Sequence, residues 1–484
     1  MTTETLDGPQ KTISFRHPVT THQNLLSSNI NKRTTTLFKC ATIAFLLLCI
    51  AGKRYFNQGP FIPLTCSLFG YACERRYDVP FRGFVHDDYV LAQEAFKNNF
   101  YIGEEVGAAV AVYVDGQLVV DMQGGWQNKE DLVPYTEDTL QLVFSCTKAL
   151  GSIVVAQFVE KGLLSYDEKI STYWPEFGQG KKENVTLGDL MQHAGGVGYL
   201  DNSFTTTDAE DPERFSKILA AQPHNFEGVR KRSYHATTRG WFVNEILRRV
   251  ANTTVHDVMM NELNEKYDIE WNLKPYQQAY DDRIAVMYRG NLFIEAVRGI
   301  QILGPTSLIQ RLFSMDRIVR KTLASKYYDM SGYVPSGVID LRYRRIEAPG
   351  FSGFTNARSI AKLAAMMANG GKAIVPDEPD LLNPKTYALA TQPIPLEWDY
   401  FIQRWMPSVH GGWGIFDYLE TDGVHFVGWT GVGGSTFWWN QEYNIGFGYC
   451  MNAMPDLNSP DERSISILRA VVKQVLKKKM DLTL

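Results

Sequence analysis

The sequence predicts an α+β domain in which one antiparallel sheet is built from both ends of the chain. Two β-rich runs, 106–114 and 117–122, flank an Asp-Gly pair that is typical of a tight hairpin turn. Three more β-rich runs precede a C-terminal amphipathic helix: 425–429, 435–440 and 444–451, then the helix at 464–478. The chain between these ends is mostly helical. We therefore expect a sheet flanked by helices, with an inserted α-rich region.

Length and composition allow a large enzyme and make nucleic acid an unexpected partner. The 484 residues suffice for one large domain or two ordinary ones, and a hydrophobic fraction of 44% can fill a sizeable core. Lys and Arg number 49 against 53 Asp and Glu, which gives a formal net charge of −4. This near balance lacks the basic surface that nucleic-acid binding needs.

The N-terminal part divides into three predicted segments before the main domain. Residues 1–36 are rich in Thr, Asn, Gln and Ser and are expected to form a disordered tail. The mostly uncharged run at 37–53 is expected to be a signal-anchor transmembrane helix; a buried core helix and a cleaved signal peptide are the alternatives. Residues 54–84 are expected to form a linker or stalk, and 85–484 the main domain.

Three observations favour a lumenal or extracellular placement of this domain. More basic residues precede the apolar run than follow it. Cys66 and Cys73 are close enough in sequence to form a disulfide in an oxidising compartment. Asn184 and Asn252 begin Asn-x-Thr glycosylation sequons. A mitochondrial location is the lesser alternative, because the segment before the apolar run is not arginine-rich.

The motif that carries the chemistry is Ser145-x-x-Lys148, just before a long helical pattern. Residues three positions apart on a helix lie on the same face, about one turn apart. The serine hydroxyl and the lysine amine can therefore meet. A lysine that is desolvated can lose its charge and accept the serine proton, so Ser145 is the predicted nucleophile and Lys148 its base.

The same spacing recurs at Ser359 and Lys362, and the neighbouring residues distinguish the two motifs. The first motif is followed by an almost uncharged apolar helix at 149–158, which favours a low lysine pKa. Asn356 and Arg358 precede the second serine, which indicates a capped and half-exposed surface helix. We therefore expect the second motif to be structural.

Four segments, in order, resemble the class C β-lactamase-like serine hydrolases, a family that includes penicillin-binding proteins, carboxylesterases and animal β-lactamase domain proteins. They are Phe-Ser-Cys-Thr-Lys at 144–148 with the turn at 159–163, then 185–197, 233–241 and 353–362. The resemblance covers roughly 85–475 and implies a β-lactamase/transpeptidase-like fold.

The resemblance also implies a catalytic role for Tyr234. In this family a tyrosine beside the lysine acts as base for the nucleophile and as acid for the leaving group. The family's asparagine two residues later is replaced by Ala236. Because that amide holds an amide side chain of the substrate in lactamases, its loss argues against true β-lactam hydrolysis.

A third family element, Lys-Thr-Gly or His-x-Gly, matches Trp429, Thr430 and Gly431, which are the predicted substrate-binding residues. Tryptophan carries no charge for a substrate carboxylate, so anionic penicillin-like substrates are disfavoured. The backbone amides of Ser145 and Val432 are the predicted oxyanion hole.

We therefore expect a serine hydrolase that forms an acyl-enzyme on an uncharged ester or amide, as a carboxylesterase, amidase or peptidase does. The expected substrate is a small-molecule ester, amide or peptide. The sequence is compatible with a homo-oligomer. We expect neither a cofactor nor a metal. The nine histidines show no ligand spacing, and the sequence has no Gly-x-Ser-x-Gly elbow. The alternative is a weak or inactive scaffold of this fold, favoured by the replacements at Ala236 and Trp429. The stretch 283–326 is expected to be helical and amphipathic, with no assigned role.

Overall fold

A computed structural model describes residues 36, 38–47, 59–62, 66, 78–290, 322, 339–417, 419, 421–454 and 461–481. The chain divides into two compact units. The first comprises 1–57 and 64–71, and its described residues 36 and 38–47 are helical. The second comprises 58–63 and 72–484 and contains the sheet and all elements discussed below.

The predicted transmembrane helix at 37–53 is wrong. Among the residues that the structure describes, no helix is both long enough and apolar enough to cross a membrane. The prediction of a single-pass membrane protein fails with it.

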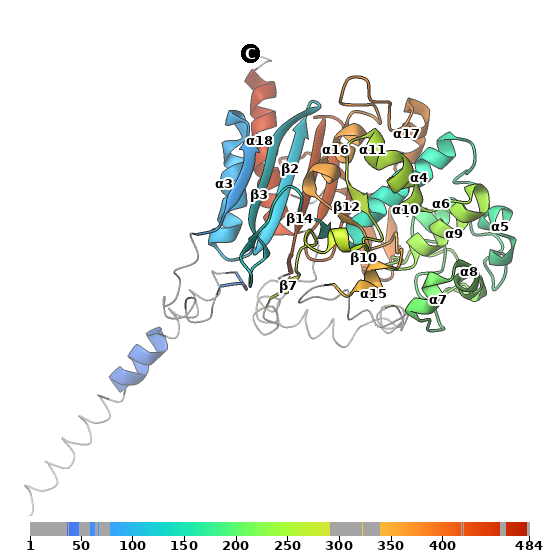
Figure 1. Ribbon diagram of the computed structural model, residues 1–484, viewed down its shortest axis with the longest axis horizontal. Helices are drawn as coiled ribbons and strands as arrows, with labels where there is room; N and C mark the ends of the chain where they lie inside the picture. Colours follow the sequence, from blue (N-terminus) through green and yellow to red (C-terminus); the bar gives the residue numbers. More distant parts are fainter. Residues whose placement is uncertain are drawn as a thin grey trace, which may run out of the picture. The chain divides into compact units, whose positions relative to one another are not determined.

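The main sheet combines strands from both ends of the chain, as predicted (Figure 1). In the described part of the chain it has eight strands. Its order is β1 (Phe81–Val85), β3 (Gln117–Asn128), β2 (Gly107–Val114), β14 (Ile445–Met451), β13 (Thr436–Asn440), β12 (Phe426–Thr430) and β11 (Gly414–Phe416), with β4 (Val133–Pro134) beside β3. All neighbouring pairs along this order are antiparallel. The N-terminal and C-terminal strands meet at β2 and β14, where Val110 pairs with Tyr449.

The hairpin between β2 and β3 turns at the expected Asp-Gly pair. Asp115 and Gly116 have φ angles of 49° and 75°, and both lie in the left-handed region that a two-residue turn of this kind requires. Aspartate and glycine both tolerate this conformation, which explains why this dipeptide identifies the turn in the sequence.

Helices cover both faces of the sheet. Alternate residues of β2 point to opposite faces: Val110 and Val112 pack with α3 (Val90–Tyr101) and α18 (Glu462–Asp481). Ala109 and Ala111 pack on the other face in the larger core, which contains α16 (Ala357–Ala368). Figure 1 shows α3 and α18 side by side on the outer face.

Helix α16 approaches β14 closely because that strand has glycines on the facing side. A Cβ atom on Gly446 would lie 2.3 Å from the backbone nitrogen of Ala365, and one on Gly448 would lie 2.4 Å from the carbonyl oxygen of Ala357. Neither distance is compatible with a side chain. The two glycines therefore set the spacing between the sheet and this helix.

The inserted helical region lies beside the sheet and surrounds a buried central helix, α4 (Thr147–Glu160). The other described helices are α5 (Ile170–Tyr173), α6 (Leu187–Met191), α7 (Thr206–Glu210), α8 (Pro212–Ala221), α9 (Arg239–Ala251), α10 (Val255–Val258), α11 (Asn264–Lys266), α15 (Leu341–Arg344) and α17 (Pro384–Ala390). Short strands form further small sheets. β8 (Phe354–Thr355) lies between β5 (Gln141–Leu142) and β6 (Trp271–Asn272), β9 (Glu397–Asp399) pairs with β10 (Arg404–Met406), and β7 (Tyr288–Arg289) pairs with β15 (Ala453–Met454).

The helical prediction for 283–326 fails at 283–290, whereas Thr322, the other described residue of this stretch, is helical. Residues 283–290 contain the bridge residue Ile284 and the short strand β7, which pairs in parallel with β15. Pairing with a distant strand here overrides the local helical pattern. The remainder of this stretch, apart from Thr322, lies outside the described residues.

Candidate active site

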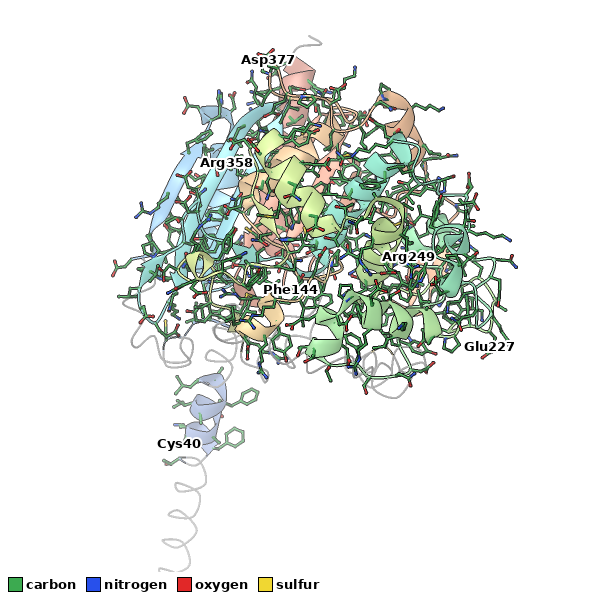
Figure 2. All side chains as sticks on the ribbon, turned by 45° about the vertical axis from the view of Figure 1, so that its right-hand side comes forward. Cys40, Phe144, Glu227, Arg249, Arg358 and Asp377 are labelled. Atoms are coloured by element: carbon green, nitrogen blue, oxygen red, sulfur yellow. The ribbon has the colours of Figure 1, made fainter. Side chains whose placement is uncertain are left out.

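Ser145 lies in a tight turn, Phe144–Cys146, that leads directly into α4. Phe144 has a φ angle of 44°, a left-handed conformation that costs a non-glycine residue about 1–3 kcal/mol. The turn is held by Thr147, whose Oγ1 donates to the Phe144 carbonyl at 2.6 Å and accepts from the Gly353 amide at 2.9 Å. Figure 2 labels Phe144 between the strands and the helices around Arg249. The strained turn places the serine where the sheet meets the helical region.

Lys148 lies one turn along and points back at the serine. Its Nζ is 3.1 Å from Ser145 Oγ, and it donates to the carbonyl oxygens of Ala236 and Gly350 at 2.6 Å each. The lysine side chain is buried, and Ser145 is only 8% exposed. The predicted pair is therefore in contact and shielded from bulk water.

The surroundings of Lys148 favour its neutral form. Burial holds the pKa of the Lys148 ammonium well below its usual range, and the buried Arg239 guanidinium lowers it further. A neutral amine has two N–H groups and one lone pair. The two N–H groups are taken by the carbonyls, so the lone pair faces the Ser145 hydroxyl and can accept its proton.

Tyr234 completes the contact from the other side of the serine. Its hydroxyl donates to Ser145 Oγ at 2.6 Å, and the Lys148 Nζ lies 4.9 Å from its ring centre. Burial raises the pKa of the Tyr234 phenol, although its hydrogen bonds with Ser145 and Trp429 oppose this rise. Tyr234 is thus a neutral phenol at neutral pH, which makes it a proton donor rather than a tyrosinate base in the free enzyme.

Trp429 forms an uncharged aromatic wall beside the tyrosine. Its ring centre lies 5.6 Å from that of Tyr234 and 5.4 Å from that of His193. Burial holds the pKa of His193 well below its usual range, and its Nδ1 accepts from the His235 amide at 3.1 Å. Both rings are therefore neutral. The segment Trp429–Gly431, which matches the family's Lys-Thr-Gly or His-x-Gly element, therefore places no cation beside Tyr234, as the tryptophan predicts.

The loop after β12 runs against the nucleophile turn. Thr430 ends the strand, and a Cβ on Gly431 would lie 2.2 Å from the carbonyl oxygen of Val143, so only glycine fits this approach. Val432 follows and is half-buried. This proximity is compatible with an oxyanion hole formed by the amides of Ser145 and Val432, which remains a prediction.

Sequence reasoning missed Arg239, the first residue of α9. It is buried and donates to the carbonyl oxygens of Lys148, Met191 and Gly412 at 2.7, 3.1 and 3.2 Å. Arg239 lies five residues after the matched Tyr234, and this proximity could have drawn attention to it. A basic residue at the start of a helix, however, ordinarily indicates a solvated surface. Asp399, which binds the Tyr234 amide, was also missed, because it lies 165 residues away in a segment without a recognised motif.

The second Ser-x-x-Lys motif is structural, but its predicted half-exposed setting is wrong. Asn356 caps α16 by accepting from the Ser359 amide at 2.8 Å, as expected. The helix, however, is buried against the sheet, and Ser359 Oγ accepts from the Glu270 amide at 2.8 Å. Lys362 is buried and paired with Glu378 at 2.7 Å. Pairing with a residue from a following loop makes a buried lysine tolerable there.

The remaining predictions concern glycosylation and a disulfide. Asn184 and Asn252 are exposed, and their glycosylation remains a prediction. Cys66 is disulfide-bonded. Cys73, its predicted partner, lies outside the described residues.

Comparison with known proteins agrees with this geometry. A family model described as beta-lactamase matches residues 96–471. The chain is 27% identical over 273 residues to an esterase/beta-lactamase of Mycobacterium tuberculosis, a match that covers 55% of this chain and 59% of that protein. The chain thus spans less than two thirds of that relative's length.

Solved structures share the fold. A family VIII carboxylesterase superposes with a TM-score of 0.70 at 25% identity, and a penicillin-binding protein homologue from Caulobacter crescentus with 0.69 at 24%. Each comparison covers 82% of this chain and 100% of the other. The family-model match, which covers most of the chain, shows that the chain belongs to the β-lactamase family.

Proposed function

We propose that this protein hydrolyses uncharged esters or amides through an acyl-enzyme formed on Ser145. One observation carries the proposal: the Ser145 hydroxyl lies between the Lys148 amine at 3.1 Å and the Tyr234 phenol at 2.6 Å, with the lysine buried. These are the groups that a serine needs to lose its proton and to pass a proton to a leaving group.

The first step is attack of Ser145 Oγ on the substrate carbonyl carbon while its proton moves to the Lys148 lone pair. The carbonyls of Ala236 and Gly350 already accept from Nζ and stabilise the resulting ammonium. The carbonyl π bond breaks, and its electrons form an oxyanion, which the amides of Ser145 and Val432 receive. One such donor contributes about 3 kcal/mol in acyl transfer.

Collapse of the tetrahedral intermediate expels the leaving group and forms the acyl-enzyme. The Tyr234 phenol donates its proton to the departing alkoxide or amine and regains one from the Lys148 ammonium, since both groups contact Ser145 Oγ. A water molecule then attacks the acyl carbon and gives a proton to the neutral Lys148 amine. The second tetrahedral intermediate collapses with cleavage of the bond between the acyl carbon and Ser145 Oγ, which takes a proton back from the Lys148 ammonium. The products are an acid and an alcohol or amine.

The uncharged wall of Trp429 and His193 supports an uncharged substrate. Trp429 carries no charge to pair with a carboxylate, and an anionic group against its indole would lose its hydration without compensation. His193, which packs on this ring, is fully buried and neutral, so it supplies no charge either. Ala236 lacks the side-chain amide that would hold a β-lactam side chain. The names of the two esterase relatives agree with ester hydrolysis as the reaction.

The proposal is tested by labelling the whole protein with a fluorophosphonate probe and mapping the modified peptide. We expect label on Ser145 and none on the Ser145→Ala variant. Ser359→Ala is the matched control, because it removes a buried serine from the same motif spacing outside the site, and it should label at the wild-type rate. Failure of folded wild-type protein to label at Ser145 would support the inactive scaffold instead.

A further inference from the structure

The backbone of Tyr234 is held by a distant hairpin through a single carboxylate. Asp399 ends β9, and its side chain is completely buried. Its Oδ1 accepts from the Tyr234 amide at 3.1 Å and from the amides of Phe401 and Ile402 in the hairpin turn at 3.0 and 2.9 Å. One oxygen therefore joins the catalytic segment to the β9–β10 turn.

The other oxygen of Asp399 faces a buried arginine from the tyrosine's own segment. Arg232 Nε lies 3.2 Å from Asp399 Oδ2, and its Nη1 donates to Ser408 Oγ at 2.6 Å. The Tyr400 amide donates back to the Arg232 carbonyl at 3.0 Å. Neither side chain of the ion pair is more than 1% exposed, so solvent does not weaken the pair.

The same hairpin also touches the tyrosine ring. The Phe401 ring centre lies 5.9 Å from that of Tyr234. On the outer side, Trp398 and Trp405 pair across the strands but remain 40% and 59% exposed. The hairpin is thus fixed chiefly by its inner contacts, among which the four donors to Asp399 are central.

We propose that Asp399 is a positioning residue that sets the place of the Tyr234 hydroxyl relative to Ser145 Oγ, an inference that rests on the proposed serine hydrolase. It donates no proton and touches no reacting atom. A hydroxyl that acts at 2.6 Å is sensitive to small backbone shifts, since a misplacement of about 1 Å costs on the order of a hundredfold in rate.

The test is Asp399→Asn, which keeps the shape and one acceptor oxygen but turns an N–H donor toward Arg232. We expect kcat to fall by about ten- to a hundredfold with little change in KM. The decisive comparison repeats the substitution in a Tyr234→Phe background. Without the tyrosine hydroxyl there is nothing left to position, so we expect no further loss. An equal fold-loss in both backgrounds would overturn the proposal and leave Asp399 a purely structural residue.

Two controls keep the result interpretable. Glu378→Gln breaks the comparable buried pair with Lys362, and it should lower stability without changing the rate per folded molecule. If Asp399→Asn does not fold, Phe401→Leu replaces it as the variant that disturbs the hairpin beside Tyr234. An equal loss of rate from Phe401→Leu with and without the Tyr234 hydroxyl would also overturn the proposal. Fluorophosphonate labelling of wild-type Ser145 distinguishes failure of the positioning proposal from failure of the proposed hydrolase. If wild-type Ser145 is not labelled, the proposed hydrolase itself is refuted.

Discussion

At the scale of the residue, Ser145 is flanked by two groups that burial drives to their neutral forms. Burial lowers the pKa of the Lys148 ammonium and raises that of the Tyr234 phenol. In the proposed mechanism the active form has both groups uncharged. Activity should therefore fall on the acid side as Lys148 gains a proton, and should persist on the alkaline side until Tyr234 ionises above the ordinary tyrosine range.

Arg239 provides a way to move the acid limb of this profile. Removing its positive charge makes a protonated Lys148 less unfavourable, so Arg239→Gln should raise the pKa of Lys148 and shift the acid limb of kcat/KM to higher pH. Arg239→Lys keeps a positive charge and should shift it less. The measurement is kcat/KM against pH for the three proteins. Identical acid limbs would show that Arg239 does not tune the lysine.

Lys148→Arg tests the base directly. Arginine keeps the positive charge but does not release its proton at accessible pH, so ester turnover should be nearly abolished, as in Ser145→Ala. Circular dichroism on both variants checks that the domain remains folded. Substantial turnover by Lys148→Arg would mean that another group takes the serine proton.

The uncharged Trp429 side chain should make the protein select neutral esters over anionic β-lactams. The protein should hydrolyse p-nitrophenyl acetate and leave benzylpenicillin nearly untouched, because the penicillin carboxylate meets neutral rings instead of a cation. Steady-state rates for both compounds, with Ser145→Ala as the blank, check this. Rapid penicillin turnover would contradict it.

Ser359→Ala should leave the rate unchanged but cost more stability than a surface change. Its Oγ is the acceptor for the Glu270 amide in a buried setting, and an unsatisfied buried donor costs about 1–3 kcal/mol. Urea denaturation of wild type and variant measures this. A change within a few tenths of a kcal/mol would show that the amide finds another partner.

At the scale of the element, the contact between α16 and β14 depends on glycine. Gly448→Ala would place a methyl group 2.4 Å from the Ala357 carbonyl, and should destabilise the domain by about 1–3 kcal/mol or more. Gly151→Ala in α4 is the matched control, since its nearest neighbour would be 3.9 Å away and alanine favours a helix by up to about 1 kcal/mol. Thermal melts of both variants should therefore shift in opposite directions.

The elements also show how far local sequence reasoning reaches. The β2–β3 hairpin and α18 follow from periodicity and turn chemistry within a few residues, and the structure confirms them. The burial of α16 was missed because Arg358 and Lys362 read as solvated, whereas each finds an acidic partner from elsewhere in the chain. Asp399 could not be identified, because its importance depends on a contact that only the tertiary fold creates.

At the scale of the whole molecule, the family resemblance identified the fold and brought attention to Ser145, Lys148 and Tyr234, which the structure places in contact. Their catalytic roles remain predictions. The transmembrane helix was inferred from an apolar run in the sequence, but no helix among the described residues is both long enough and apolar enough to cross a membrane.

The meeting of β2 and β14 at the centre of the sheet has a consequence for synthesis of the protein. The β2–β3 hairpin leaves the ribosome early, yet one edge of β2 stays unpaired until β14, near the end of the chain, has been translated. Contacts between such distant segments form slowly, and an open strand edge invites association with other chains in the meantime. Nascent chains that stall before β14 should therefore be insoluble without chaperones, however complete their nucleophile helix already is.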